Sequence, residues 1–278
     1  MLYFVATPIG NLLDLSPRAL EVLNEVDFIA AEDTRRTRKL LTHFYIKTKL
    51  FSFHQHNERA GTEKIITKLL EGKSIAVVSD SGMPLISDAG QLLAEKLWEE
   101  NIEYTCIPGA SAVEVALVMS GMPTDKFRFL GFAPRDKNEY KEFLKSALSE
   151  SITTIIFESP KRILKTLEDI SKIDSSRKIA VARELTKIHE EVIRGSAKEI
   201  ISHFSDGEVR GECVIVIAPA PKHEDKKAEY NLAEMVDKIQ KISDLPHTKI
   251  AKIISALTGI SKREIYNETT KHTKHTKF

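Results

Sequence analysis

Short apolar runs alternate with longer amphipathic segments over the first 120 residues. The apolar runs are rich in β-branched and aromatic side chains, and they predict strands at Leu2–Ala6, Phe28–Ala31, Leu50–Phe53, Ser74–Ser79 and Tyr104–Ile107. The segments between them have helical spacing and predict helices at Pro17–Asn24, Thr34–His43, Asn57–Leu70, Asp88–Glu100 and Ser111–Met119. Because such alternation requires crossover connections, we expect a largely parallel sheet with helices on both faces.

A second pattern begins near Gly121-Met122-Pro123. It predicts strands at Phe127–Phe132, Thr153–Phe157, Ile179–Ala182, Glu191–Ile193 and Glu212–Ala218. Helices are expected at Asn138–Leu148, Pro160–Ser171 and Ala197–Phe204. Since two of these strands follow each other without a helix between them, we expect a mixed sheet and a second α/β domain.

The last part of the chain has a different composition. Ala218-Pro219-Ala220-Pro221 leads into the charged run Lys222–Lys227, which is typical of a linker. Helical patterns follow at Leu232–Ile242, Thr248–Leu257 and Lys262–Thr269. The expected organisation is therefore an N-terminal α/β domain, a second α/β domain, a linker and a helical C-terminal segment, at residues 1–121, 122–220, 221–230 and 231–278.

Four serines are predicted to cap helices. Ser16 stands before a proline at the first helical position, an arrangement that favours an N-cap. Ser111, Ser196 and Ser261 are each followed three residues later by a glutamate, which is the pattern of a capping box.

Composition places the chain among ordinary soluble proteins, with 42% hydrophobic and 29% charged residues. No run approaches the roughly 20 apolar residues needed to span a bilayer. The opening residues read as a strand rather than a signal peptide. The two cysteines, Cys106 and Cys213, lie in apolar runs and are expected to be buried thiols in a reducing compartment, so we expect a cytoplasmic protein. No Cys/His spacing suggests a metal site.

The charge is unevenly distributed although the net charge is only +1. The segment from Lys222 to Phe278 holds 12 lysines and arginines against 8 aspartates and glutamates, whereas the rest of the chain is slightly acidic. This asymmetry indicates that the C-terminal segment is the part best suited to contact nucleic acid.

Polar and turn-forming residues follow four of the predicted strands. They form the groups Thr7–Gly10, Glu32–Arg35, Ser79–Pro84 and Pro108–Ser111. Each alone is typical of an ordinary turn or helix cap. Because the carboxyl ends of parallel strands lie at one edge of a sheet, we expect all four groups to surround one ligand site. The glycine-rich signatures of dinucleotide and P-loop sites are absent, as is a G-x-S-x-G nucleophile elbow.

These groups belong to a longer series of motifs in fixed order. The series comprises Thr7–Leu12 with Asp14, Ala31–Arg35, His54–Glu58, Val77–Asp88, Pro108–Ala112, Gly131-Phe132, Phe157–Pro160 with Arg162, Ala182–Lys187 and Gly211-Glu212. Together they closely resemble the ribosomal RNA small subunit methyltransferase I family, part of the tetrapyrrole methylase superfamily. The resemblance runs from Leu2 to about Ile217 and continues more loosely through the helical tail. Met83 departs from it, since many members have threonine there.

The resemblance implies a two-domain α/β homodimer that binds S-adenosyl-L-methionine in a cleft between its domains. It also implies 2′-O-methylation of a decoding-centre cytidine in 16S rRNA, so the expected partner is this RNA or the small ribosomal subunit. The motifs that match the family's cofactor contacts contain Pro8, Gly10, Asp80, Ser81, Gly82, Met83, Pro84, Gly109, Ser111, Glu184 and Leu185.

A ribose hydroxyl is a poor acid, so methyl transfer to it calls for a positioned base. The candidates for catalysis are Glu32, Asp33, Arg35 and His54. Residues suited to phosphate or substrate contact are His56, Asn57, Arg183, Lys187, Lys262 and Arg263. For Arg183-Glu184, a structural ion pair is an equally good interpretation.

Two alternatives remain open from the sequence. The first is a tetrapyrrole or other small-molecule methylase of the same superfamily. The second is a nucleic-acid-binding regulator, because Thr248–Asn267 resembles a helix-turn-helix. A plain three-helix packing module explains that segment better, and the basic tail then serves as an accessory RNA-contacting arm.

Overall fold

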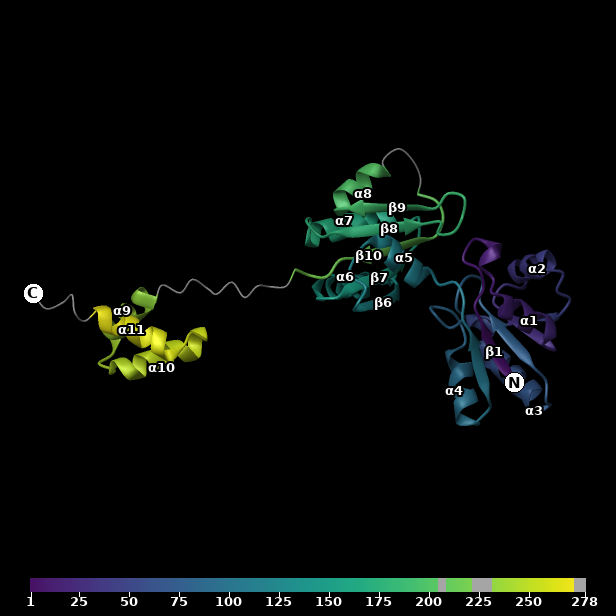
Figure 1. The fold of residues 1–278 in the computed structure, drawn as a ribbon, viewed down its shortest axis with the longest axis horizontal. Helices are drawn as coiled ribbons and strands as arrows, with labels where there is room; N and C mark the ends of the chain where they lie inside the picture. Colours follow the sequence, from purple (N-terminus) through teal and green to yellow (C-terminus); the bar gives the residue numbers. More distant parts are fainter. Residues whose placement is uncertain (205–208, 222–231, 273–278) are drawn as a thin grey trace, which may run out of the picture. The chain divides into compact units, whose positions relative to one another are not determined.

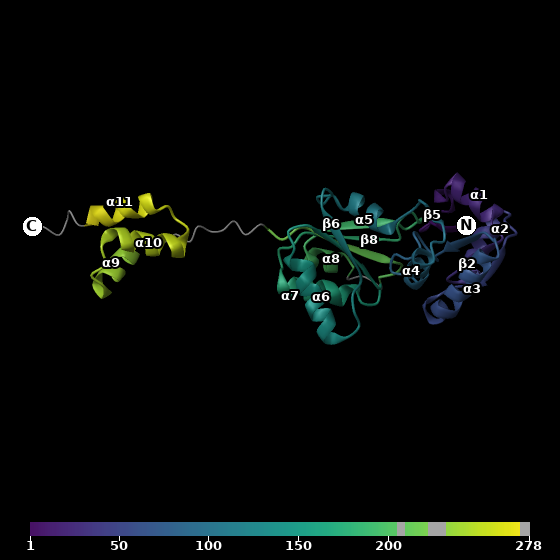
Figure 2. The same cartoon turned by 90° about the horizontal axis from the view of Figure 1, so that it is seen from below.

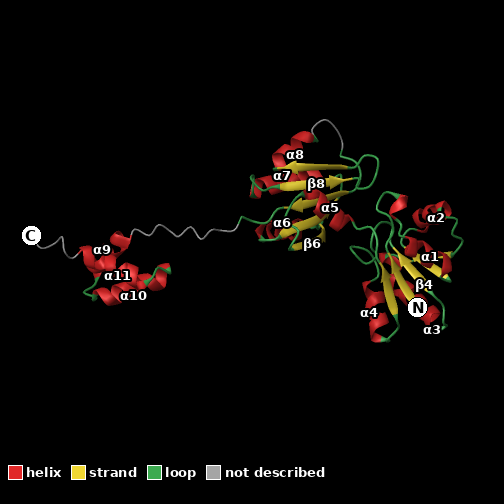
Figure 3. Ribbon diagram, viewed as in Figure 1, coloured by secondary structure: helices red, strands yellow, loops and turns green. Residues whose placement is uncertain are grey.

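The computed structural model describes residues 1–204, 209–221 and 232–272 of the chain. The chain divides into two compact units, Met1–Ala220 and Pro221–Phe278 (Figure 1). The first unit contains two five-stranded sheets, and the second contains helices (Figure 3). The mixture of one parallel and one mixed α/β sheet that the sequence predicts is confirmed. The further division at residue 121 stays a prediction.

All neighbouring strands of the first sheet run parallel, in the order β3-β2-β4-β1-β5. The strands are β1 (Leu2–Val5), β2 (Phe28–Ala31), β3 (Lys49–Ser52), β4 (Ile75–Val78) and β5 (Tyr104–Ile107). The central strand β4 is buried along its whole length, as its continuous apolar run requires, whereas the edge strands β3 and β5 are partly exposed.

Helices cover both faces of this sheet. Helices α1 (Pro17–Glu25) and α2 (Thr34–His43) contribute to one hydrophobic cluster, and α3 (Glu58–Leu70) and α4 (Gln91–Glu99) contribute to the cluster on the opposite face. Short 3-10 turns, η1 (Leu12–Asp14) and η2 (Gln55–Asn57), precede α1 and α3. Each fully buried Leu or Ile side chain contributes roughly 1.5–3 kcal/mol.

The connections reverse direction between β1 and β4. From β1 the chain passes to β2 and β3 on one side of the sheet, whereas from β4 it passes to β5 on the other side. Such a reversal opens a crevice at the carboxyl ends of the two strands, which is where open α/β sheets bind ligands. The loops after β1 and β4 therefore occupy the ligand-binding position of this fold.

The second sheet is mixed, in the order β6-β7-β10-β8-β9. Only β6 and β7 run parallel, and every other pair of neighbours is antiparallel. The strands are β6 (Phe127–Phe132), β7 (Thr153–Glu158), β8 (Ile179–Arg183), β9 (Glu191–Gly195) and β10 (Cys213–Ile217).

Helix α5 (Ala112–Ser120) follows the first sheet in sequence but packs against the second. It covers one face of the second sheet, while α6 (Lys137–Ser149), α7 (Ile163–Ile173) and α8 (Ala197–His203) cover the other (Figure 2). Ile9, from the loop after β1, packs in the same cluster as α5. The first loop of the parallel sheet is thereby joined to the second sheet.

The C-terminal unit is a three-helix module of α9 (Leu232–Ile242), α10 (His247–Thr258) and α11 (Lys262–His272). Its small core contains Val236, Ile250, Ala251, Ile254 and Ile265, which are all buried. Gly259 ends α10 with a φ of 71°, the left-handed conformation that glycine adopts without steric cost. The three helices that the sequence predicts are confirmed.

Most predicted helix caps are present. The side chains of Ser16 and Ser196 accept hydrogen bonds from the third residue of α1 and α8, and Glu199 completes a capping box. Ser261 accepts the backbone N–H of Glu264 at 3.3 Å. The capping box predicted at Ser111 is wrong, because this side chain makes no capping hydrogen bond.

Two helices begin three residues later than the sequence predicts. Helix α4 begins at Gln91 rather than Asp88, because Ser87 and Gly90 have φ values of 66° and 127° that no right-handed helix accommodates. Helix α7 begins at Ile163 rather than Pro160.

The prediction of two buried thiols is half right. Cys213 lies on β10 and is buried, whereas Cys106 is exposed. Cys106 is on the edge strand β5, where an apolar run is covered less completely than in the sheet centre. In the part of the chain that the structure describes, no helix is long and apolar enough to cross a membrane.

Candidate functional site

The loops after β1 and β4 are held together by a short backbone bridge. The N–H of Thr7 donates to the carbonyl of Gly82 at 2.9 Å, and the N–H of Gly82 donates back to Thr7 at 3.0 Å. Gly82 has a φ of 82°, so a side chain at this position would be strained. The Thr7 hydroxyl also donates to the carbonyl of Ser79 at 3.2 Å. The two loops at the crevice therefore form one fixed structure.

Gly10 allows the loop after β1 to approach a loop of the second sheet. A Cβ on Gly10 would lie 2.7 Å from the carbonyl oxygen of Leu185 and from Oγ1 of Thr186. The Thr186 hydroxyl accepts the backbone N–H of Asn11 at 3.0 Å. Glu184 and Thr186 have positive φ values of 48° and 63°. Such strain in non-glycine residues is common at functional sites.

A cleft of about 250 Å³ lies at this junction. Four of the predicted cofactor residues and one predicted substrate residue line it, namely Pro8, Gly10, Asp80, Ser81 and Lys187. Basic residues of α2 and an acid at the start of β10 also line it, namely Arg36, Lys39 and Glu212. The volume is just below the range of roughly 300–1,000 Å³ common for small-molecule sites. A larger ligand would therefore extend out of the cleft.

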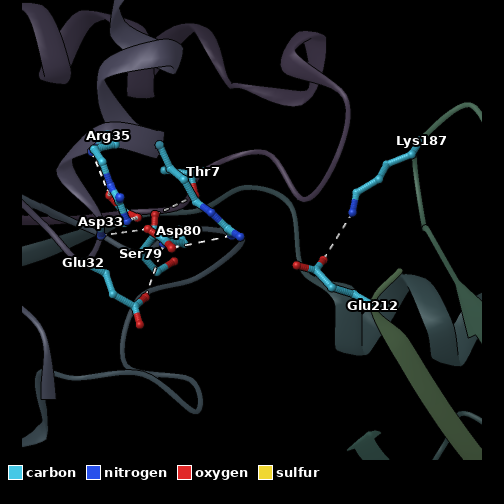
Figure 4. Close-up of polar contacts among 9 residues, drawn as sticks. Thr7, Glu32, Asp33, Arg35, Ser79, Asp80, Lys187 and Glu212 are labelled. Carbon is cyan, nitrogen blue, oxygen red and sulfur yellow. Dashed lines mark hydrogen bonds and ion pairs between the residues drawn. The ribbon is translucent and has the colours of Figure 1, made fainter. Parts of the chain in front are cut away.

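Asp80 ties the ends of β2 and β4 together. Its Oδ1 accepts the backbone N–H of Asp33 at 2.9 Å, and its Oδ2 lies 3.6 Å from the guanidinium of Arg36. The backbone N–H of Asp80 donates to Oε2 of Glu32 at 3.5 Å. Figure 4 shows these acidic side chains gathered on one side, while Lys187 points toward Glu212 on the other. The predicted catalytic carboxylates thus lie beside a predicted cofactor residue.

Glu32 and Asp33 have opposite electrostatic surroundings. Hydrogen bonds from Arg35 lower the pKa of Asp33 to about 2, and Arg35 Nη2 lies 2.9 Å from Asp33 Oδ2. Asp33 is also the N-cap of α2, where it accepts the N–H of Arg35 at 2.8 Å. By contrast, burial and then the charge of Asp80 raise the pKa of Glu32. Of the two, Glu32 is the better proton acceptor.

The loop between β3 and α3 brings a histidine to this cluster. A positive charge on His54 would act on Glu32, because its electrostatic effect lowers the pKa of that carboxyl. Nδ1 of His54 is buried and has no hydrogen-bond partner within the described part of the chain. The ring of His56 lies 5.9 Å away, centroid to centroid. Asn57 accepts the His54 N–H at 2.8 Å and donates to Ser52, so its amide fixes the loop.

Two predicted residues of the second sheet are held in ion pairs. Arg183 Nε lies 2.6 Å from Oε2 of Glu191. Arg183 therefore forms a structural ion pair in this structure. Lys187 Nζ lies 2.9 Å from Glu184 and 3.5 Å from Glu212, and its hydrogen bond lowers the pKa of Glu184. Lys187 therefore brings the only cation from the second sheet among the residues lining the cleft.

The other predicted contacts are spread around the cleft or away from it. Gly82, Met83, Pro84, Gly109, Ser111, Glu184 and Leu185 do not line it. A Cβ on Gly109 would lie 2.9 Å from Cβ of Ala6, so this glycine permits close packing of the β1 and β5 ends. Lys262 and Arg263 belong to α11 of the C-terminal unit.

Comparison with known proteins identifies the family. Residues 1–201 match the tetrapyrrole (corrin/porphyrin) methylases. The chain belongs to this family. The methylase is 42% identical to "Ribosomal RNA small subunit methyltransferase I" of Halalkalibacterium halodurans over 96% of this chain and 93% of the relative. It is 48% identical to the protein of the same name from Thermotoga maritima over 78% of this chain and 97% of the relative.

Solved structures show the same fold. A cobalt precorrin-4 methyltransferase aligns with a TM-score of 0.61 and 16% identity, and the match covers 78% of this methylase and 94% of that protein. At 16% sequence identity, this structural similarity is evidence for the fold alone. The match to the Thermotoga maritima relative spans 217 residues, about the length of the first unit. That relative is therefore about as long as the first unit alone.

Asp88 is an acidic residue of the methylase's site that the sequence motifs did not single out. Asp88 follows Ser87 in the loop before α4, and burial followed by the charges of Glu32 and Asp80 raises its pKa to about 7. A hydrogen bond with Ser79 opposes that shift. The repeated Ser-Asp pairs, Ser79-Asp80 and Ser87-Asp88, could have revealed it. The apolar spacing after Asp88 instead favoured a helix start.

Proposed function

We propose that this methylase transfers a methyl group from S-adenosyl-L-methionine to the ribose 2′-oxygen of a decoding-centre cytidine in 16S rRNA. The observation that carries the proposal is the half-buried Glu32 carboxyl, with its raised pKa, beside the cleft residue Asp80. Relatives at 42% and 48% identity bear the name of a small-subunit rRNA methyltransferase, which supports RNA as the substrate.

The cleft residues fit a cofactor of this kind. The Pro8–Gly10 loop and the Asp80–Pro84 loop present backbone close to the crevice, where small residues and the fixed Thr7–Gly82 bridge let a ligand approach. Glu184 and Leu185 would contribute from the loop that Gly10 contacts. Gly109 and Ser111 precede α5, whose first N–H groups favour a carboxylate.

When bound, S-adenosyl-L-methionine supplies an activated methyl group that transfers in one in-line displacement. The chain's own residues must then align the hydroxyl and accept its proton. Glu32 is placed for this second task, because desolvation raises the pKa of its carboxyl above the ordinary value of a glutamate. His54, whose Nδ1 has no hydrogen-bond partner in the described part of the chain, is the next candidate.

Asp33 and Arg35 have a supporting role in this proposal. Arg35 fixes Asp33 as an ionised helix cap, so neither is available as a base. Asp33 in turn donates its N–H to Asp80 and so positions the acidic cluster. Arg36, Lys39 and Lys187 line the cleft and suit the phosphates beside the target nucleotide.

Several further features are proposed on the family resemblance. We propose a cytoplasmic homodimer whose first unit comprises domains at 1–121 and 122–220. In addition, His56, Asn57 and Arg183 would contact the substrate, Asn57 and Arg183 after exchanging their present partners. Lys262 and Arg263 would contact RNA phosphates from the helical arm.

Two assays with the purified full chain test the proposal. Titration calorimetry should detect S-adenosyl-L-methionine binding, and labelled methyl groups should appear in small-subunit RNA but not in a precorrin. A protein that binds the cofactor but methylates only the tetrapyrrole would support the small-molecule alternative. A protein that binds RNA without binding the cofactor would support the regulator.

A further inference from the structure

A basic groove lies on the edge strand β3, outside the cleft. It has a volume of about 530 Å³ and is lined by β3, by Arg38 of α2, by the turn before β3 and by lysines of α3. Five cations line it, Arg38, Lys47, Lys49, Lys64 and Lys68, and no carboxylate does. Across the described residues, none of the five forms an ion pair. Their charges are therefore available to an anionic partner.

Two of these cations are ordered by aromatic rings. The ammonium of Lys64 lies 4.3 Å from the ring centroid of Phe51, and that of Lys68 lies 4.2 Å from the ring of Phe28. Lysines on an edge strand also prevent pairing with another sheet. That explanation suits Lys49 on β3, but it does not account for cations on both neighbouring helices.

Tyr45 stands in the turn that leads from α2 to β3. Its side chain is 89% exposed, and its φ of 59° is in the left-handed region. Tyr45 N–H donates to Thr42, Ile46 N–H donates to Leu41, and the side chain of Ile46 is buried. Glycine is the usual residue at this helix-ending position. The chain instead keeps a strained, exposed aromatic ring two residues before Lys47.

Helix α2 connects this groove to the cleft. Arg36 and Lys39 line the cleft, whereas Arg38 lines the groove. Helix α2 therefore carries cations toward both the proposed methyl-transfer site and the β3 groove. Phosphates suit its cations, and an unpaired base suits an exposed ring, so the complementary partner is single-stranded nucleic acid.

We propose that the β3 groove binds the sugar–phosphate backbone of the RNA strand that flanks the target nucleotide, with Tyr45 stacking on an unpaired base. This inference rests on the proposed function, and it specifies a substrate surface that the family's motifs do not include. The groove determines affinity and register for RNA, while the cleft binds the cofactor.

A triple variant tests the cations. Lys47→Gln, Lys49→Gln and Lys64→Gln are combined, and binding to deproteinised 16S rRNA is measured from low to moderate salt. Three lost phosphate contacts should flatten the log–log salt slope by about 2 and weaken binding at least ~10-fold. Cofactor affinity should not change. The matched control combines Lys137→Gln, Lys141→Gln and Lys161→Gln, on exposed lysines of α6 and the β7–α7 connection.

The ring is tested by Tyr45→Gly. Glycine relieves the backbone strain, so the variant should be at least as stable as the wild type in urea denaturation. Loss of one stacked base should still weaken RNA binding roughly fivefold or more. Weaker RNA binding in a protein that is not destabilised is a result that a purely structural role for Tyr45 does not produce.

The results separate this inference from the proposed function. If the wild-type protein binds the cofactor and methylates rRNA, but the groove triple variant and Tyr45→Gly bind RNA normally, the inference is overturned and the function stands. Equal losses in the groove and control triples also overturn it, because charge alone would then explain binding. If the wild-type protein methylates no rRNA, the proposed function itself fails.

Discussion

The backbone N–H of Asp80 points at the carboxylate of Glu32, at 3.5 Å, although the two side chains carry like charges. The charge of Asp80 helps to raise the pKa of Glu32, and Asp80 remains in place because Asp33 and Arg36 bind its two carboxylate oxygens. Asp80 thus raises the pKa of Glu32, and the residues after β2 and β4 hold Asp80 in the position from which it does so.

Replacement of Asp80 by Asn should shift the pH dependence of methyl transfer. Without the Asp80 charge, the pKa of Glu32 falls, so the acidic limb of the rate profile moves to lower pH. The rates are measured from pH 5 to pH 9 with saturating cofactor. The exposed Asp125→Asn variant is the control. An unchanged acidic limb in Asp80→Asn would show that Glu32 does not control the rate.

Glu32→Gln should lower methyl transfer at least ~10²-fold while cofactor affinity stays within a factor of about two. Asp33→Ala should act differently, because Asp33 caps α2 and is paired with Arg35. Loss of that cap should cost about 1 kcal/mol in stability, measured by urea denaturation, and should reduce turnover less than Glu32→Gln does. Near-normal turnover in Glu32→Gln would show that Glu32 is not the base, and His54 would then be the next candidate.

The raised pKa of Asp88 predicts how the stability of the protein depends on pH. Its pKa rises from an ordinary 3.8 to about 7, so the folded state binds a proton that the unfolded state releases between these values. This contribution to stability is complete at low pH and is lost as the pH rises toward 7. Asp88→Asn removes this half-buried charge, so the variant should gain stability relative to the wild type as the pH rises from 5 to 8. A stability difference that is constant with pH would contradict the half-buried position of Asp88 beside Glu32 and Asp80.

Gly10→Ala should weaken cofactor binding. Its Cβ would lie 2.7 Å from the carbonyl of Leu185, so the loop after β1 and the Glu184–Lys187 loop must separate at the cleft. Gly72→Ala is the control, since no atom lies within 4 Å of its Cβ and only the backbone cost remains. Calorimetry should find lower cofactor affinity for Gly10→Ala alone. Equal affinity in the two folded variants would place the cofactor away from this junction.

The sequence predicts the helices and strands well because the spacing of apolar residues follows which face of each element is buried. The alternating apolar runs place correctly all ten strands that the described residues form, and the parallel order of the first sheet follows from the helices between its strands. Burial at sheet edges is harder to predict, as Cys106 shows, because the run on β5 gives no sign of its edge position.

The site is predictable where it consists of strand ends. Glu32, Asp33 and Asp80 meet as expected, since the ends of parallel strands share one edge. Pairings that depend on the second sheet are not visible in sequence, such as the contact of Gly10 with Leu185 and the choice of Glu191 as the partner of Arg183. Asp88 was missed because positive φ values at Ser87 and Gly90 break a helix that the local pattern favours.

Removal of Lys222–Phe278 should leave cofactor binding intact and weaken RNA binding. The cleft residues all lie in the first unit, and the Thermotoga maritima relative matches a length of chain close to that unit. Each lost phosphate contact should also flatten the salt slope by roughly 0.7–0.9. Sedimentation of the truncated protein checks whether any loss arises from subunit dissociation. Full RNA affinity with an unaltered slope would show that the helical arm does not contact RNA.

The position and chemistry of the transferred methyl group test the central proposal most directly. Small-subunit RNA is incubated with the purified protein and isotope-labelled S-adenosyl-L-methionine, and fragments and nucleosides are analysed by mass spectrometry, with Glu32→Gln as the parallel control. We expect label in one 2′-O-methylcytidine of the decoding centre, and very little with the variant. Label on a base, label at another site, or no label in RNA with a cofactor-binding protein would contradict the proposal.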